Sequence, residues 1–144
     1  MTHEDRGHYA KKHPPDRKMD TKVAEAVKQQ ASNGEISCAA AHKISSDFNI
    51  SPSEVGVAAD FLEIRIVKCQ LGLYGYRPKK GVVKPAETVS QTLKEVINQS
   101  LINGRLPCGA VWDIAERLTM GKMEVSSACE TLKTKISSCQ LGAF

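Results

Sequence analysis

The sequence contains an internal duplication, in which residue i of the first copy matches residue i+70 of the second copy without a gap. The tetrapeptide Cys-Gln-Leu-Gly occurs at 69–72 and again at 139–142, and Asn-Gly occurs at 33–34 and again at 103–104. Matches of this kind at one fixed register are the signature of a repeated structural unit. The chain is therefore expected to fold as two copies of one small unit.

Each copy predicts three helices. In the first copy, apolar residues at helical spacing indicate helices over 21–32, from Ser37 and from residues 51–54. The run Ser-Pro-Ser-Glu at 51–54 combines a capping hydroxyl, a proline at the first helical position and a glutamate three residues after the cap. The alternating, β-branched stretch 64–71 then predicts a short strand, with its counterpart at 134–141. The expected fold class is mainly α: two tandem three-helix units that allow short strands after each third helix.

Two details of the first and second helices follow from local sequence. Asn33-Gly34 is expected to end the first helix, because this pair suits a left-handed C-terminal cap. The apolar face of the second helix is expected to be buried, and its residues are Cys38, Ala41, Ile44 and Phe48.

The repeat divides the chain into four segments. Residues 1–20 are expected to form a flexible N-terminal arm, because Pro14-Pro15 and mixed charges oppose a packed element. Residues 21–74 and 87–144 are the two repeats. Residues 75–86 form a linker rich in glycine, proline and lysine.

This linker region carries the net charge of the chain. Segment 73–86 has a formal charge of +4, equal to that of the whole sequence, because its bases stand without any acid. The four bases are Arg77, Lys79, Lys80 and Lys84. Such a cluster attracts anions, and its simplest alternative role is to keep the chain soluble.

The second and third helices of each copy, with the short turn between them, have the layout of a helix-turn-helix. Small or apolar side chains stand at the expected contact points, which are Ile44, Ser45, Phe48, Ile50 and Val55. The turn holds Asn49 in one copy and Thr119 in the other, where the motif needs a left-handed residue. Segments 44–55 and 114–125 thus resemble the helix-turn-helix superfamily, and the following strand, glycine loop and Val82-Val83 resemble the wing of a winged-helix domain.

The resemblance implies a DNA-binding, transcription-regulator-like protein whose third helix enters the major groove. Carried over by position, the contact residues at and after the helix starts are Ser51, Ser53, Lys122 and Ser126. The outer positions that follow are Gly56, Val57 and Asp60, with Met123, Ser127 and Glu130 in the second copy. Only Lys122 among these is a side chain that commonly reads base edges. The resemblance therefore implies contact with double-stranded DNA mainly through phosphates, which the basic linker would bind.

Two other functions remain open. Three-helix units of this shape also serve as protein-interaction or assembly modules with no nucleic-acid ligand. The repeated thiols could instead form a redox or metal sensor; they are Cys38, Cys69, Cys108 and Cys139. We expect these thiols to be buried and unmodified and assign no metal, because structural zinc sites usually draw their ligands from close pairs.

Several classes of protein are not indicated. The sequence holds no catalytic motif, so we expect no enzymatic activity and no cofactor. It has no long apolar run, which predicts no membrane insertion. Five cysteines without a close pair are typical of a reducing compartment, so a cytoplasmic location is expected. The oligomeric state is not predicted.

Overall fold

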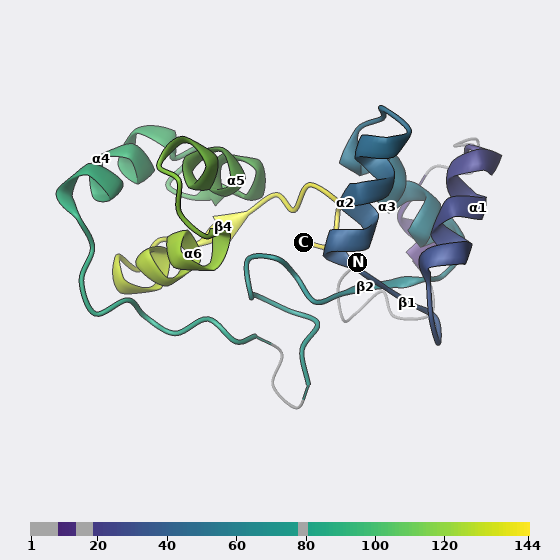
Figure 1. The fold of residues 1–144 in the computed structure, drawn as a ribbon, viewed down its shortest axis with the longest axis horizontal. Coiled ribbons are helices and arrows are strands. Elements are labelled where there is room, and N and C mark those ends of the chain that lie inside the picture. Colours follow the sequence, from purple (N-terminus) through teal and green to yellow (C-terminus); the bar gives the residue numbers. More distant parts are fainter. Residues whose placement is uncertain (1–8, 14–18, 78–80) are drawn as a thin grey trace. The chain divides into compact units, whose positions relative to one another are not determined.

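A computed structural model describes residues 9–13, 19–77 and 81–144 of the chain (Figure 1). The contacts divide the chain into two units. The first unit contains Met1–Cys69 together with Gln140–Phe144, and the second contains Gln70–Cys139. Within the described residues the elements are mainly helices with short strands, which confirms the predicted fold class.

The helices and strands of the two repeats correspond one to one. Those of the first repeat, preceded by the 3-10 helix η2 (Tyr9–Lys12), are α1 (Thr21–Gln30), β1 (Glu35–Ser37), α2 (Cys38–Asp47), α3 (Pro52–Phe61) and β2 (Arg65–Val67). Those of the second repeat are α4 (Gln91–Ser100), β3 (Leu106–Pro107), α5 (Cys108–Arg117), α6 (Lys122–Thr131) and β4 (Ile136–Ser137). Helices α2 and α3 begin and end 70 residues before α5 and α6. The duplication seen in the sequence is therefore also present in the structure.

The strands pair in parallel. In the first unit β1 pairs with β2, with Ile36 opposite Ile66, and in the second unit β3 pairs with β4, with Leu106 opposite Ile136. A parallel pair needs a crossover connection, and here the helix-turn-helix itself supplies it. The short strands predicted after each third helix are therefore present, and they hold the two ends of the motif together.

Backbone dihedrals repeat between the copies. Non-glycine residues with positive φ occur in four pairs separated by 70 positions: Asn33 and Asn103, Asn49 and Thr119, Glu63 and Lys133, and Lys68 and Ser138. Several of these side chains are poorly suited to the left-handed region. The shared fold, rather than each local residue type, therefore imposes this backbone path.

The predicted end of the first helix was wrong. Helix α1 ends at Gln30 and is followed by the extended residue Ala31. Asn33 and Gly34 instead form a two-residue turn, in which both have positive φ and the backbones of Ser32 and Glu35 exchange hydrogen bonds of 2.8 and 3.0 Å. Asn-Gly suits a tight turn with two positive φ values as well as it suits a helix cap, which explains the error.

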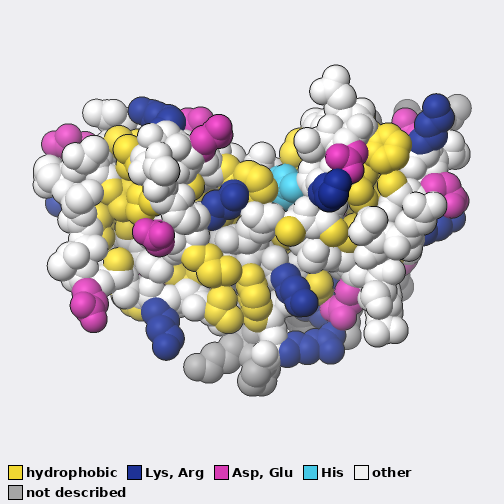
Figure 2. Space-filling view, viewed as in Figure 1, with side chains coloured by type: hydrophobic (Ala, Val, Ile, Leu, Met, Phe, Trp, Pro, Cys, Tyr) yellow, Lys and Arg dark blue, Asp and Glu magenta, His cyan; other side chains and the backbone are white. Residues whose placement is uncertain are grey.

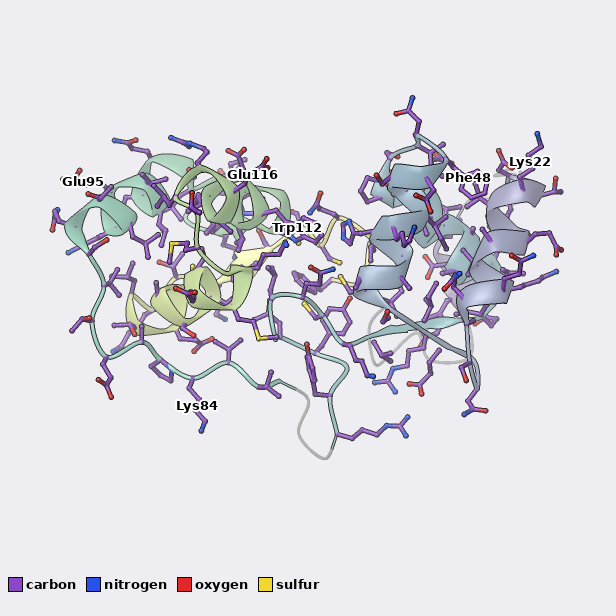
Figure 3. The ribbon with its side chains drawn as sticks, viewed as in Figure 1. Lys22, Phe48, Lys84, Glu95, Trp112 and Glu116 are labelled. Carbon is purple, nitrogen blue, oxygen red and sulfur yellow. The ribbon has the colours of Figure 1, made fainter. Side chains whose placement is uncertain are left out.

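The core of each unit contains the expected faces of the second and third helices. Cys38, Ala41 and Ile44 are buried as predicted. Phe48 is not, because α2 ends at Asp47 and the phenylalanine follows the last turn, leaving its side chain 42% exposed. Its ring borders an open concavity beside α1, near Lys22 (Figure 3).

The segment that follows β2 packs in the second unit, and the segment that follows β4 packs in the first. Leu71 comes from the first repeat and is 1% exposed within the second unit, whereas Leu141 comes from the second repeat and is 2% exposed within the first. Ala143 is also buried in the first unit. The two repeats have thus exchanged their Gln-Leu-Gly segments, an arrangement that differs at the segment ends from the division into 21–74 and 87–144 expected from the repeat.

The left-handed turn residues give a test of this fold. Replacing Thr119 with asparagine should raise the free energy of unfolding by about 1 kcal/mol, because a β-branched residue is strained at its φ of 52°. The matched change Asn49→Thr, at the same φ, should lower it by a similar amount. Urea denaturation measures both, and changes of the same sign would contradict the left-handed conformation at these two positions.

Candidate functional site at the helix-turn-helix motifs

The turn of each motif has the geometry that the sequence predicted. In the first unit the backbone N–H of Ile50 donates to the carbonyl of Ser45 at 3.0 Å, and the Ser45 hydroxyl donates to the carbonyl of Ile50 at 2.6 Å. Asn49 lies between them with a φ of 52°. In the second unit Met120 donates to the carbonyl of Ala115 at 2.9 Å, without a hydroxyl at that position. Each pair of helices is thus fixed at its turn.

The starts of the third helices hold several of the predicted contact residues. Ser51 and Ser53 are exposed, with their hydroxyl oxygens 2.9 Å apart. The Lys122 ammonium lies over the ring of Trp112, 4.4 Å from its centroid (Figure 3 labels Trp112). A cation held over an indole face is stabilised there by the ring's quadrupole. The one base-reading side chain predicted for this interface therefore already has a partner in its own unit.

Ser126 was predicted to contact DNA, and this prediction was wrong. The residue is fully buried, at 0% exposure, and its hydroxyl donates to the carbonyl of Lys122 at 3.3 Å. A hydroxyl in this position cannot reach a ligand unless the packing of the second unit changes.

The outer side of α3 is covered by the chain's own C-terminal segment. A Cβ added at Gly56 would lie 2.8 Å from the carbonyl carbon of Leu141 and would overlap the carbonyl oxygen. Such contacts do not occur between real atoms, so the close approach requires glycine at position 56. The position predicted to face a DNA groove is instead in van der Waals contact with a peptide backbone.

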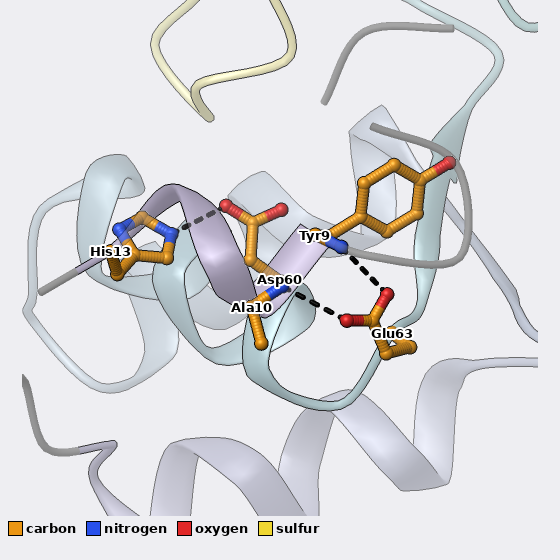
Figure 4. A network of polar contacts seen from close by, with 5 residues as sticks. All are labelled: Tyr9, Ala10, His13, Asp60 and Glu63. Carbon is orange, nitrogen blue, oxygen red and sulfur yellow. Dashed lines mark hydrogen bonds and ion pairs between the residues drawn. The ribbon is translucent and has the colours of Figure 1, made fainter. Parts of the chain in front are cut away.

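The N-terminal residues cover the same helix further along (Figure 4). The Glu63 carboxylate accepts hydrogen bonds from the backbone N–H groups of Tyr9 and Ala10, at 2.8 and 2.9 Å. His13 Nε2 lies 2.7 Å from Oδ2 of the buried Asp60. Part of the arm expected to be flexible is therefore packed, and Asp60 is not free to face a groove.

Helix α6 is covered by the residues that follow β2. Gly72 lies against Met123, since a Cβ added at this glycine would be 3.4 Å from the methionine sulfur. Ala86 donates its N–H to the carbonyl of Ser127 at 3.0 Å, and its carbonyl accepts from the Thr131 hydroxyl at 2.7 Å. The segment expected to form a wing has no strand among its described residues, and instead lies along α6.

The basic residues of the linker are solvent-facing where they are described. Arg77 and Lys84 are exposed, and Figure 3 shows Lys84 pointing away from the ribbon. Lys79 and Lys80 lie outside the described residues. On the face visible in Figure 2, Lys and Arg side chains are interspersed with Asp and Glu in each unit.

The thiols are mostly buried. Cys38, Cys69 and Cys108 are buried as predicted, whereas Cys139 is only partly buried and lies 3.9 Å from the Tyr74 hydroxyl. Burial, and secondarily the charge of Glu130, raises the pKa of Cys129 to about 11. Within the described part of the chain, no cluster of three or more side chains could hold a metal ion.

Comparison of the chain with protein-family models, with curated proteins and with solved structures found no match. Among the described residues, none of the helices combines the length and the apolar character needed to cross a bilayer.

Thiol labelling tests the burial of the cysteines. At pH 8 Cys129 should have roughly 0.1% of its thiol as thiolate, so alkylation in the native state should be slow. The partly exposed Cys139 should react first, and Cys139→Ser should remove the fast phase followed by mass spectrometry. Fast native labelling at position 129 would contradict the burial.

Proposed function

We propose that this chain is a protein-interaction module in which the third helix of each helix-turn-helix binds a peptide segment rather than a DNA groove. The observation that supports this most is the contact of Gly56 with the backbone of Leu141. It is a contact between a helix and the backbone of a turn at Gln140 and Leu141, at a position that the resemblance to DNA-binding proteins would assign to a groove.

The energetics favour the peptide as occupant. For α3 to enter a major groove, DNA would have to displace Leu141, whose burial contributes about 1.5–3 kcal/mol. It would also have to displace the η2 residues that donate hydrogen bonds to Glu63. In return α3 offers the groove no Arg, Lys, Asn or Gln between residues 51 and 61.

The two covered helices share one form of ligand. Each unit contains a Gln-Leu-Gly segment from the other repeat, with the leucine buried. The glycine that follows it has a positive φ in both cases, 78° at Gly72 and 80° at Gly142. A buried leucine followed by a glycine turn is therefore the recognition element that we propose for these sites.

A peptide-binding measurement tests the proposal. A labelled peptide of residues 138–144 should bind the full chain carrying Leu141→Asp, in which a buried charge displaces the internal segment. It should bind the unaltered chain roughly 100-fold more weakly, because the internal segment competes at an effective concentration near the millimolar range.

Two controls make this measurement specific to α3. Adding Gly56→Val to the Leu141→Asp chain should abolish binding, because the valine side chain fills the contact. A peptide with aspartate in place of leucine should not bind. Equal binding to the altered and unaltered chains, or no binding to either, would reject the proposed peptide site.

DNA-backbone binding by the linker is a second candidate function. Exposed Arg77 and Lys84 favour it, because they stand in a segment without acids. Contacts of this kind release counterions and do not require α3 or α6 to enter a groove.

A salt titration tests this second candidate. With mixed-sequence duplex DNA between about 50 and 200 mM salt, Lys79→Ala combined with Lys80→Ala should reduce the log–log salt slope by about two, because each substitution removes one bound phosphate. The matched control Lys22→Ala with Lys28→Ala removes the same charge from α1 and should leave the slope unchanged. Absence of binding at the lower salt concentration would reject DNA as a ligand.

A further inference from the structure

We infer that the α3 site also accepts residues 140–144 of a second copy of this chain, so that two copies associate by exchanging this segment. This inference rests on the proposed peptide recognition, and the partner that supplies the peptide is a second copy of the chain. Within one chain the two repeats have already exchanged equivalent segments, and a second copy carries an identical segment.

The site requires nothing that only the internal segment can supply. Its contacts include the bare backbone at Gly56 and the burial of Leu141 and Ala143. A segment from another copy presents the same backbone and the same two side chains. The internal and external segments therefore differ only in their effective concentration at the site.

The backbone before each exchanged segment favours reopening. The chain passes from one unit to the other after Cys69 and again after Cys139. The residues immediately before these points, Lys68 and Ser138, have φ values of 52° and 54° without being glycine. Left-handed backbone at such residues is strained, and an extended conformation at Ser138 would relieve the strain and redirect the segment. Strained hinges of this kind promote domain swapping.

Two complementary variants of the full chain test the exchange. Gly56→Ala blocks the site but leaves the segment intact, and alanine is the better helix former, so α3 itself should remain folded. Leu141→Asp disables the segment but leaves the site open. In sedimentation velocity each variant alone should remain near the monomer mass of 15.7 kDa. An equimolar mixture should give a species of about twice that mass, because one chain donates the segment and the other receives it.

The outcomes separate this inference from the proposed function. If the mixture stays monomeric while the labelled 138–144 peptide still binds the Leu141→Asp chain, exchange between copies is rejected and peptide recognition stands. If neither the mixture nor the peptide associates, both ideas fail.

A hinge variant provides an independent check. Ser138→Pro cannot adopt the positive φ of the closed path, so it should form a dimer on its own, whereas Ser138→Gly should remain monomeric. A Ser138→Pro chain that is folded by circular dichroism and monomeric would overturn the inference.

Discussion

The close approach between Gly56 and the backbone of Leu141 is the constraint on which the interpretation of this protein depends. It is possible only because position 56 has no side chain, and it places a peptide against the helix that a DNA-binding motif would keep clear. Burial of Leu141 adds apolar free energy to this contact. Together these contacts make residues 140–144 part of the first unit, although their sequence belongs to the second repeat.

Much of the fold could be predicted because the duplication and the helix signals are local. Helix α3 begins at Pro52, directly after Ser51, as the run at 51–54 predicts, although the Ser51 hydroxyl makes no capping hydrogen bond. Asn49 and Thr119 both have the left-handed conformation that the turn requires. Phe48 and Asn33-Gly34 were misassigned because the same residues suit more than one local structure. The exchange of segments could not be predicted, because Cys-Gln-Leu-Gly is identical in the two copies and nothing in it specifies which unit it joins.

The candidate site was predicted less well than the fold. Ser51 and Ser53 are exposed as a contact surface would require, but Ser126 is buried and Lys122 lies over Trp112. A signal was present in the sequence at Gly56. Glycine inside a helix costs roughly 1 kcal/mol relative to alanine, and the equivalent residue in the other copy is Ser126. A helical glycine of this kind usually has a packing reason, and at position 56 that reason is the backbone of Leu141.

The most direct test of a peptide lying on α3 is a nuclear Overhauser effect between the α-protons of Gly56 and Leu141 in the full, unaltered chain. A Cβ added at Gly56 would lie 3.3 Å from the Leu141 Cα. One α-proton of Gly56 points in that direction, so it should be close enough to the Leu141 α-proton to give a clear cross-peak. Observation of this cross-peak would establish that the segment lies on α3. An ordered α3 without any cross-peak to residues 140–144 would contradict the proposed contact.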